Sequence, residues 1–296
     1  MNPREAGFLL LTSHLGNPDR KPLTVPQLRT LAERVRNMER EEPDRELEAR
    51  DLAALGYGMD LARRIVALLE ESDSLEHYLR RGQRLDCVPI SRIGEKYPAI
   101  LRKRLGLDAP GCLWAKGELS LLETPMMSLV GSRELEEENL AFAAEVGRQA
   151  ALQGYTLVSG NARGADRTAQ NACLNYGGSV ICVVADELAR QPVRERVLYL
   201  SEDGFEEGFS AQRALSRNRV IHALGEKAFV AQCGYKVGGT WDGTVKNLRF
   251  GWSPVCCFDD GSEAMKLLEQ MGAEKVHMEQ LSDLRSLGIR ERSLFD

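Results

Sequence analysis

Two glycine-containing segments constrain the fold of this chain more than any other feature of its sequence. Val130-Gly131-Ser132-Arg133 follows the apolar run Met126 to Val130, and the segment Ser159 to Asp166 follows the run Tyr155 to Val158. Helical periodicity comes after each segment, so both are predicted to be strand–turn–helix junctions. Two such junctions in succession have the rhythm of β-α units. We therefore predict an α/β fold with a mostly parallel sheet.

Junctions of this kind can bind anions. Glycine lets a ligand come close to the backbone, and the free N–H groups and the dipole of the following helix favour negative charge there. Arg133 and Arg163 add forked donors that suit phosphate. We expect a ligand site at the carboxyl edge of the sheet. The alternative is that each loop is a tight turn that needs glycine only for its backbone.

Five separated motifs between Asp86 and Gly272 support a more specific interpretation. They are, in order, Lys96-Tyr97-Pro98 with Leu101, Leu113-Trp114-Ala115-Lys116-Gly117-Glu118-Leu119, Val130-Gly131-Ser132-Arg133, Ser159-Gly160 with Ala162, Gly164 and Asp166, and Ser216-Arg217-Asn218-Arg219-Val220-Ile221. This order resembles that of the DNA-processing protein A family (DprA, also called Smf). The resemblance implies a doubly wound, Rossmann-like domain of the superfamily that joins DprA to the LOG nucleotide hydrolases.

The resemblance also implies a function. Proteins of the DprA type hold single-stranded DNA and pass it to RecA recombinase during DNA uptake and recombination, as in the natural transformation of competent cells. We therefore expect a single-stranded DNA-binding protein rather than an enzyme, with RecA as a partner. Rossmann-like domains of this family tend to pair, so we also expect a homodimer.

The expected binding site combines the two loops with the element Arg217 to Arg219 and a third glycine-rich loop, Val237 to Thr244. Its predicted nucleic-acid or phosphate ligands are Gly131, Ser132, Arg133, Ser159, Gly160, Arg163, Gly164, Asp166, Arg217, Asn218, Arg219, Gly238, Gly239 and Thr240. The arginines would supply charge, the hydroxyls would contact the ligand and the glycines would let it approach, while Asp166 orients an arginine or caps a helix. The alternative role for Arg217 and Arg219 is an internal salt bridge that supports the loops.

Composition limits the kind of partner. A net charge of −5 argues against a protein that coats duplex DNA, so a nucleic-acid site must be a local concentration of arginine. No apolar run reaches the ~18 residues of a membrane helix. With no signal peptide at the start either, we expect a cytoplasmic protein that does not bind membranes. The seven cysteines and four histidines lack ligand-like spacing. We predict no metal and no cofactor, and buried cysteines that act as small hydrophobic residues.

Other segments are predicted to flank the central domain. Residues 1–85 show helical periodicity and are predicted to form a small all-helical domain. Within it, the piece Leu52 to Val66 resembles a helix-hairpin-helix unit, which could contact DNA phosphate or serve only for packing. Residues 86–275 are assigned to the Rossmann-like domain and residues 276–296 to a weakly amphipathic tail. We expect the ~20 residues past Gly272 to be too few for the winged-helix domain that many DprA proteins carry.

The central domain has further predicted elements. The charged stretch Asp186 to Phe209 is predicted to be a surface loop, or alternatively a basic flap over the ligand. Pro254 to Phe258 is predicted to be the last strand, and Ala264 to Gly272 a closing helix.

Two alternative functions use the same pocket. A LOG-type phosphoribohydrolase requires a catalytic glutamate after its glycine-rich loop, but Asn247 stands at that position here, so Asp166 or Asp242 would have to substitute. A sensor of a nucleotide-derived ligand, for example in phage defence, is the second alternative. It is suggested by Gln170, where the family usually has histidine, and by the divergent third loop.

Overall fold

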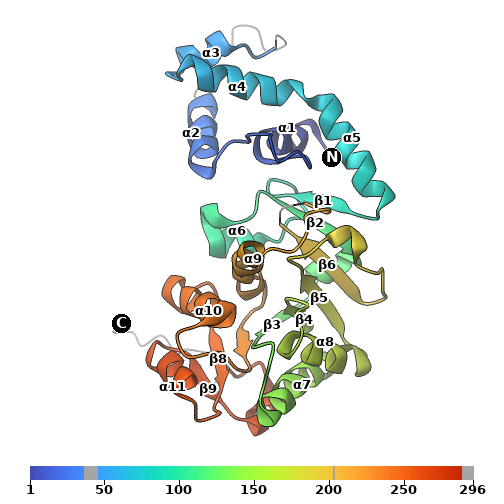
Figure 1. The fold of residues 1–296 in the computed structure, drawn as a ribbon, viewed down its shortest axis with the longest axis vertical. Coiled ribbons are helices and arrows are strands. Elements are labelled where there is room, and N and C mark those ends of the chain that lie inside the picture. Colours follow the sequence, from blue (N-terminus) through green and yellow to red (C-terminus); the bar gives the residue numbers. More distant parts are fainter. Residues whose placement is uncertain (37–45, 203, 289–296) are drawn as a thin grey trace. The chain divides into compact units, whose positions relative to one another are not determined.

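The computed structural model describes residues 1–36, 46–202 and 204–288, which form two compact units (Figure 1). The first unit contains Met1–Tyr97, Pro110–Trp114 and Glu202–Glu206, and the second contains Pro98–Ala109, Ala115–Ser201 and the chain from Glu207 onward. Residues 37–45 of the predicted helical domain and 289–296 of the predicted tail lie outside the described ranges. The domain limits at residues 85 and 275 stay predictions.

The first unit is helical over its N-terminal part, as predicted. Its helices are α1 (Pro3–Thr12), α2 (Val25–Arg36), α3 (Ala49–Ala54), α4 (Met59–Glu70) and α5 (Ser72–Arg84), followed by the short strand β1 (Val88–Ser91). Helix α4 forms because Ala62, Ile65 and Leu68 recur on one face, and this face is buried in the helical core. Helix α5 contributes Tyr78, which packs with Trp114 and Phe205 at ring-centroid distances of 5.1 and 4.6 Å.

A mostly parallel sheet forms the core of the second unit. Its strands are β3 (Met126–Val130), β4 (Thr156–Ser159), β5 (Ser179–Val183), β6 (Val197–Ser201), β7 (Ala228–Val230), β8 (Val255–Phe258) and β9 (Glu274–Val276), and β2 (Cys112–Gly117) begins in the first unit and ends in the second. The order across the sheet is β1-β2-β6-β5-β4-β3-β7-β8-β9, and every pairing from β6 to β9 is parallel. The predicted doubly wound, Rossmann-like fold is confirmed.

The direction of winding reverses at β3. The chain runs outward from β3 through β4 and β5 on one side, and from β7 through β8 and β9 on the other. Open parallel sheets bind ligands beyond the carboxyl ends of the strands at such a switch point. A ligand site is therefore expected in the space beyond Val130 and Val230, the last residues of β3 and β7.

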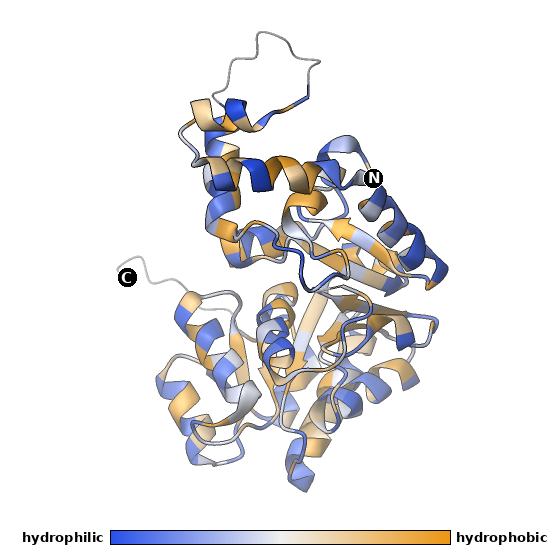
Figure 2. Ribbon diagram, turned by 45° about the horizontal axis from the view of Figure 1, so that its top comes forward, coloured by the Kyte–Doolittle hydropathy of each residue, from blue (hydrophilic) through white to orange (hydrophobic). Residues whose placement is uncertain are grey.

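Helices cover both faces of this sheet. They are α6 (Ala99–Leu105), α7 (Glu137–Leu152), α8 (Ala165–Asn175), α9 (Ala211–Leu224), α10 (Gly238–Phe250) and α11 (Glu263–Gln270), with short 3₁₀ turns at Gly106–Asp108, Leu119–Glu123, Leu188–Arg190 and Met278–Asp283. The crossover connections place α7 and α8 on one face and α9 and α10 on the other (Figure 1). Apolar strands run through the centre of the unit in Figure 2, and the buried patterns of β3, β4 and β6 agree.

Three predicted local elements are wrong. The stretch Asp186 to Phe209 is not all loop, because β6 lies inside it and pairs with β5. Pro254 to Phe258 is not the last strand, since β9 follows and pairs with β8. The third glycine-rich segment is loop only up to Val237, because helix α10 already begins at Gly238.

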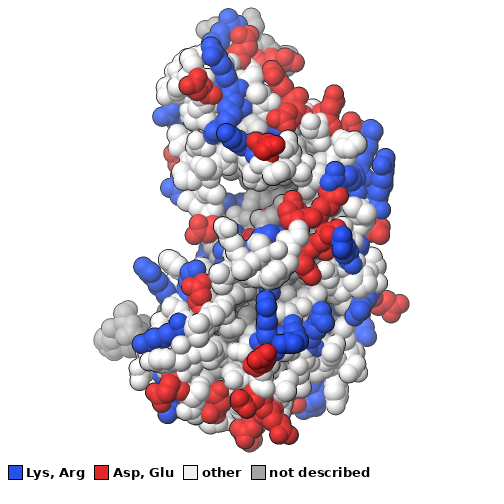
Figure 3. All heavy atoms as spheres, in the orientation of Figure 1, with Lys and Arg blue, Asp and Glu red and all other residues white. Residues whose placement is uncertain are grey.

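The predicted cysteine environment is confirmed, because all seven cysteines are free and buried. Within the described ranges, no helix is long and apolar enough to cross a membrane. The same ranges hold no group of three or more His, Cys, Asp or Glu side chains placed to bind a metal ion. Basic and acidic side chains are interspersed over the face shown in Figure 3, in keeping with the small net charge.

Candidate functional site

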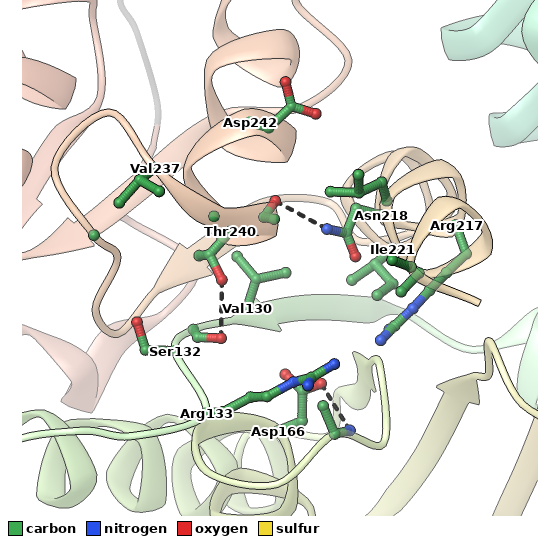
Figure 4. Close-up of a pocket in the computed structure, with 18 of the residues that line it drawn as sticks. Val130, Ser132, Arg133, Asp166, Arg217, Asn218, Ile221, Val237, Thr240 and Asp242 are labelled. Atoms are coloured by element: carbon green, nitrogen blue, oxygen red, sulfur yellow. Dashed lines mark hydrogen bonds between the residues drawn. The ribbon is translucent and has the colours of Figure 1, made fainter. Parts of the chain in front are cut away.

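A pocket of about 1040 Å³ opens at the switch point of the sheet. It lies within the second unit, beyond the carboxyl end of β3 and beside the first turns of α9 and α10 (Figure 4). The residues that line it are Val130, Gly131, Ser132, Arg133, Glu134, Ala162, Asp166, Phe209, Ala211, Ala214, Leu215, Arg217, Asn218, Ile221, Gly234, Val237, Gly238, Gly239, Thr240, Asp242 and Lys246. The volume is of the size that holds a small ligand or one unit of a polymer.

Arg217 supplies a buried positive charge to this pocket. It lies on α9 one turn before Val220 and Ile221, whose burial turns this face of the helix towards the sheet. The arginine is only 7% exposed, and its Nε and Nη1 atoms have no hydrogen-bond partner among the described residues. Burial lowers the pKa of Arg217, while Asp166 opposes that shift. A buried guanidinium with unused donors is costly unless an anion pairs with it.

Gly160 makes room for this guanidinium. A Cβ atom added at Gly160 would collide with Nη1 and Cζ of Arg217. The loop after β4 therefore needs glycine here, because the arginine head lies directly against its backbone.

Arg133 adds a second cation at the carboxyl end of β3. Figure 4 shows Arg133 and Arg217 extending from opposite sides of the pocket towards Asp166. The Cζ atom of Arg133 lies 5.8 Å from the centroid of the Phe209 ring, which also lines the pocket. Two guanidinium groups that converge on one space are suited to an oxyanion such as phosphate.

Asp166 supports the loop that follows β4. Its Oδ2 atom accepts the N–H groups of Gly160 and Ala162, at 3.1 and 3.0 Å. Burial raises the pKa of Asp166, and Arg217 and the two N–H groups lower it. The carboxylate thus occupies the two loop donors that would otherwise face an anion.

Several N–H groups of the first two loops are engaged inside the protein and are therefore not open to an anion. Ser132 donates its N–H to the Gln232 carbonyl at 3.0 Å, and Ala165 donates its N–H to the Ser132 carbonyl at 3.2 Å. Together with Gly160 and Ala162, these groups tie the loops to each other and to the segment after β7. The glycines of the two loops therefore serve close packing in this structure.

The start of α10 is the open helix end at the pocket. The N-cap residue Val237 offers no capping side chain, and no acidic residue lies in the first turn. The first N–H groups of an α-helix have no partner within the helix and carry partial positive charge. The hydroxyl of Thr240 donates to the Gly131 carbonyl at 2.9 Å, and Asn218 donates its amide to the Gly239 carbonyl at 3.0 Å. These two bonds fix the helix end beside β3 and α9 (Figure 4).

The structure brings nine of the fourteen predicted ligand residues to the pocket. These are Gly131, Ser132, Arg133, Asp166, Arg217, Asn218, Gly238, Gly239 and Thr240, whereas Ser159, Gly160, Arg163, Gly164 and Arg219 do not line it. Ser159 is buried and accepts a hydrogen bond from Gln170.

The two arginines outside the pocket have partners on its periphery. The exposed Arg163 pairs with Glu134 at 3.1 Å. Arg219 donates to the Asp108 carbonyl at 3.0 Å and also contacts Ser216. The internal role weighed for Arg219 thus appears as hydrogen bonds to backbone and hydroxyl groups. The role of Arg163 and Arg219 as ligands of a nucleic acid stays a prediction.

Sequence reasoning missed the apolar part of the lining. Phe209, Leu215 and Val237 line the pocket and are 59%, 46% and 66% exposed. Phe209 is the last residue of the stretch that was predicted as a charged surface loop. Nothing in that stretch indicated that its ring would line a pocket. Val237 was predicted only as the first residue of the third glycine-rich loop, without a role for its side chain.

The position expected for a LOG-type glutamate lies off the pocket. Asn247 is buried on α10, accepts the N–H of Ser253 at 2.9 Å and lies 3.1 Å from Nδ1 of His222. These contacts fasten α10 to α9 and to the start of β8. The contacts of Asn247 are thus structural, and the side chain at this position is an amide, whereas a LOG-type enzyme needs a carboxylate.

The fold and this site define a class, a Rossmann-like α/β protein with an arginine-lined pocket at the switch point of its sheet. The sequence profile of the DNA recombination-mediator protein A family matches residues 90–280. The chain therefore belongs to that family, which confirms the resemblance.

Relatives of known name agree with this assignment. DNA processing protein DprA of Streptococcus pneumoniae is 33% identical over 182 residues, covering 57% of this chain and 64% of that protein. Protein Smf of Escherichia coli is 28% identical over 142 residues, covering 44% and 38%. The match thus spans less than two thirds of either relative.

Solved structures show the same fold. The X-ray structure of Streptococcus pneumoniae DprA has a TM-score of 0.70 at 24% identity and covers 93% of this chain and 95% of its own. DNA processing protein A from Helicobacter pylori, whose structure was reported for its single-stranded DNA binding mode, has a TM-score of 0.55 at 21% identity and covers 67% and 94%.

Proposed function

We propose that this protein binds single-stranded DNA and that the pocket at the switch point holds a phosphate of the strand. The observation that carries the proposal is Arg217, a nearly buried guanidinium whose Nε and Nη1 donors are unused and which lines the pocket. A phosphate would pair with it, and Arg133 and the start of α10 would add charge of the same sign. Family membership and the DNA-binding relative from Helicobacter pylori support DNA as the source of that phosphate.

A single strand suits this site better than a duplex. The charge of the whole chain is negative, so long-range attraction to duplex DNA is weak. Single strands are held instead by a local basic groove together with surfaces for the bases. The pocket supplies both, since its cations lie beside exposed apolar side chains.

The more specific aspects of the function, beyond DNA binding itself, are also proposals. Delivery of the strand to RecA recombinase is supported by the recombination-mediator description of the family. It is tested by adding the protein to RecA and coated single-stranded DNA and measuring filament formation. The expected homodimer, the cytoplasmic location and the role in transformation stay predictions. Size-exclusion chromatography with light scattering measures the assembly directly.

The test of DNA binding is a fluorescence-anisotropy titration with labelled oligonucleotides of increasing length. We expect affinity to grow with length, and we expect unlabelled single strand to compete better than duplex DNA. Binding of a mononucleotide without any binding of oligonucleotides would contradict the proposal and favour the nucleotide-sensor class. Release of free base from a nucleoside monophosphate would favour the LOG-type enzyme.

A further inference from the structure

The mouth of the pocket carries exposed apolar side chains beside its cations. A phosphate alone would leave these apolar side chains uncovered. Phe209, Leu215 and Val237 line it from the segment before α9, from α9 itself and from the N-cap of α10. Each of them is more than 40% exposed. Exposed apolar groups gathered beside buried cations favour a ligand that carries an anionic and an apolar part close together.

Phe209 is the aromatic residue among those that line the pocket. Its ring lies beside Arg133, with 5.8 Å between the ring centroid and Cζ. A group stacked on the exposed ring would therefore lie next to a cation that can hold a phosphate. An aromatic ring beside a cation is the combination that binds single-stranded nucleic acid, with a base on the ring and a phosphate on the cation.

The backbone at Phe209 is anchored on both sides. Arg213 donates to the carbonyls of Glu207 and Gly208, at 2.6 and 2.7 Å. The next residue, Ser210, caps α9 by accepting the N–H of Arg213 at 3.0 Å. A side chain held on a fixed backbone loses little freedom when a ligand stacks on it.

We propose that Phe209 is the base-stacking residue of this pocket and receives the base next to the phosphate held by Arg133 and Arg217. The inference rests on the proposed function and deepens it, because it assigns a place to the base as well as to the phosphate. Stacking on a phenyl face tolerates any base, so this contact adds affinity without sequence preference.

The test compares an oligothymidylate with an abasic strand of the same length, which keeps the phosphates and lacks the bases. Phe209→Ala weakens oligothymidylate binding by about 5-fold or more, the effect of losing one stacked base, and leaves abasic binding unchanged. Phe209→Trp retains oligothymidylate binding, and its added tryptophan emission is quenched when the strand binds. Phe250→Ala is the matched control, since Phe250 is 61% exposed and does not line the pocket.

Several outcomes overturn the assignment. Equal losses for both strands with Phe209→Ala would mean that the ring supports Arg133 rather than a base. Unchanged oligothymidylate binding would show that no base stacks there. Failure of the proposed function is a separate result, namely binding of the abasic strand that does not depend on Arg133, or no binding of it by the unsubstituted protein. In that case the Phe209 variants with oligothymidylate still decide the stacking role.

Discussion

Gly160 and Arg217 are coupled, because the backbone of one lies against the guanidinium of the other. We expect Gly160→Ala to displace the arginine head with little loss of stability, since the displaced atoms are the end of a flexible side chain. DNA affinity should fall roughly tenfold, the value of one charge-assisted contact. Anisotropy titration measures this. Gly58→Ala is the control, because a Cβ there meets nothing within 4 Å, and equal affinity of both variants would contradict the coupling.

Two substitutions at Asp166 separate the effect of its hydrogen bonds on stability from the effect of its charge. Asp166→Asn keeps an oxygen for the N–H groups of Gly160 and Ala162, whereas Asp166→Ala leaves both donors unpaired inside the protein. We expect the alanine variant to lose about 2–4 kcal/mol of unfolding free energy. The asparagine variant should lose less, because it keeps the hydrogen-bond acceptor and gives up only the charge that faces Arg217. Urea denaturation distinguishes them, and similar stability of the two variants would show that the loop does not depend on these bonds.

His222 gives the protein an acid-sensitive core. Burial lowers the pKa of His222 from 6.5 to about 4. An unfolded chain therefore binds a proton at this residue between pH 6.5 and about 4 that the folded chain excludes, so stability falls as the pH drops through that window. The loss is at most about 3 kcal/mol. His222→Gln should flatten this part of the pH profile of unfolding, whereas His77→Gln, at an exposed helix position, should not.

At the scale of elements, the C-terminal segment is fastened by Lys227 together with Gln153, which accepts the N–H of Leu284 at 2.8 Å and donates to the Leu281 carbonyl at 2.9 Å. Nζ of Lys227 is directed to the carbonyls of Leu284, Arg285 and Leu287. Burial lowers the pKa of this ammonium group. Leu281, Leu284 and Leu287 are buried, as expected for a tail that is amphipathic. The end of the chain is thus part of the second unit up to the last described residues.

Replacing this lysine should release the segment. We expect Lys227→Met to speed amide hydrogen exchange over residues 278–288, with a loss of about 2–3 kcal/mol in stability, because charged hydrogen bonds to carbonyls are removed. Lys266→Met is the control, since Lys266 makes an exposed pair with Glu263. Unchanged exchange in Lys227→Met would mean that the leucines and Gln153 hold the segment without the lysine.

The elements that the sequence predicted best are those whose pattern is local. The apolar runs of β3 and β4 and the helical periodicity of α7 could be recognised from the local sequence alone. Strand β6 was missed because it stands in a stretch rich in charged residues, and β9 because only Val276 of its three residues is buried. Two glycines made the start of α10 resemble a loop, yet contacts of Thr240 and Asn218 hold that turn in a helix.

At the scale of the whole molecule, topology assembled the site. The carboxyl ends of β3 and β7 are neighbours although they are distant in the sequence, and α9 and α10 close the space beyond them. The parallel pattern could therefore predict a pocket at this edge. It could not predict that Arg163 and Arg219 have other partners, since those depend on Glu134 and on the Asp108 carbonyl. Side-chain direction is decided by tertiary contacts that a motif does not contain.

The central claim is that Arg133 and Arg217 hold a DNA phosphate. The most direct measurement is the salt dependence of oligonucleotide affinity for the unsubstituted protein, Arg133→Ala, Arg217→Met and the control Arg249→Ala, which changes an exposed arginine at the far end of α10. Each pocket variant, once shown to be folded by circular dichroism, should bind more weakly at low salt and lower the slope of log K against log salt by about 0.7, the value for one phosphate contact on a single strand. Slopes identical to that of Arg249→Ala would contradict the account.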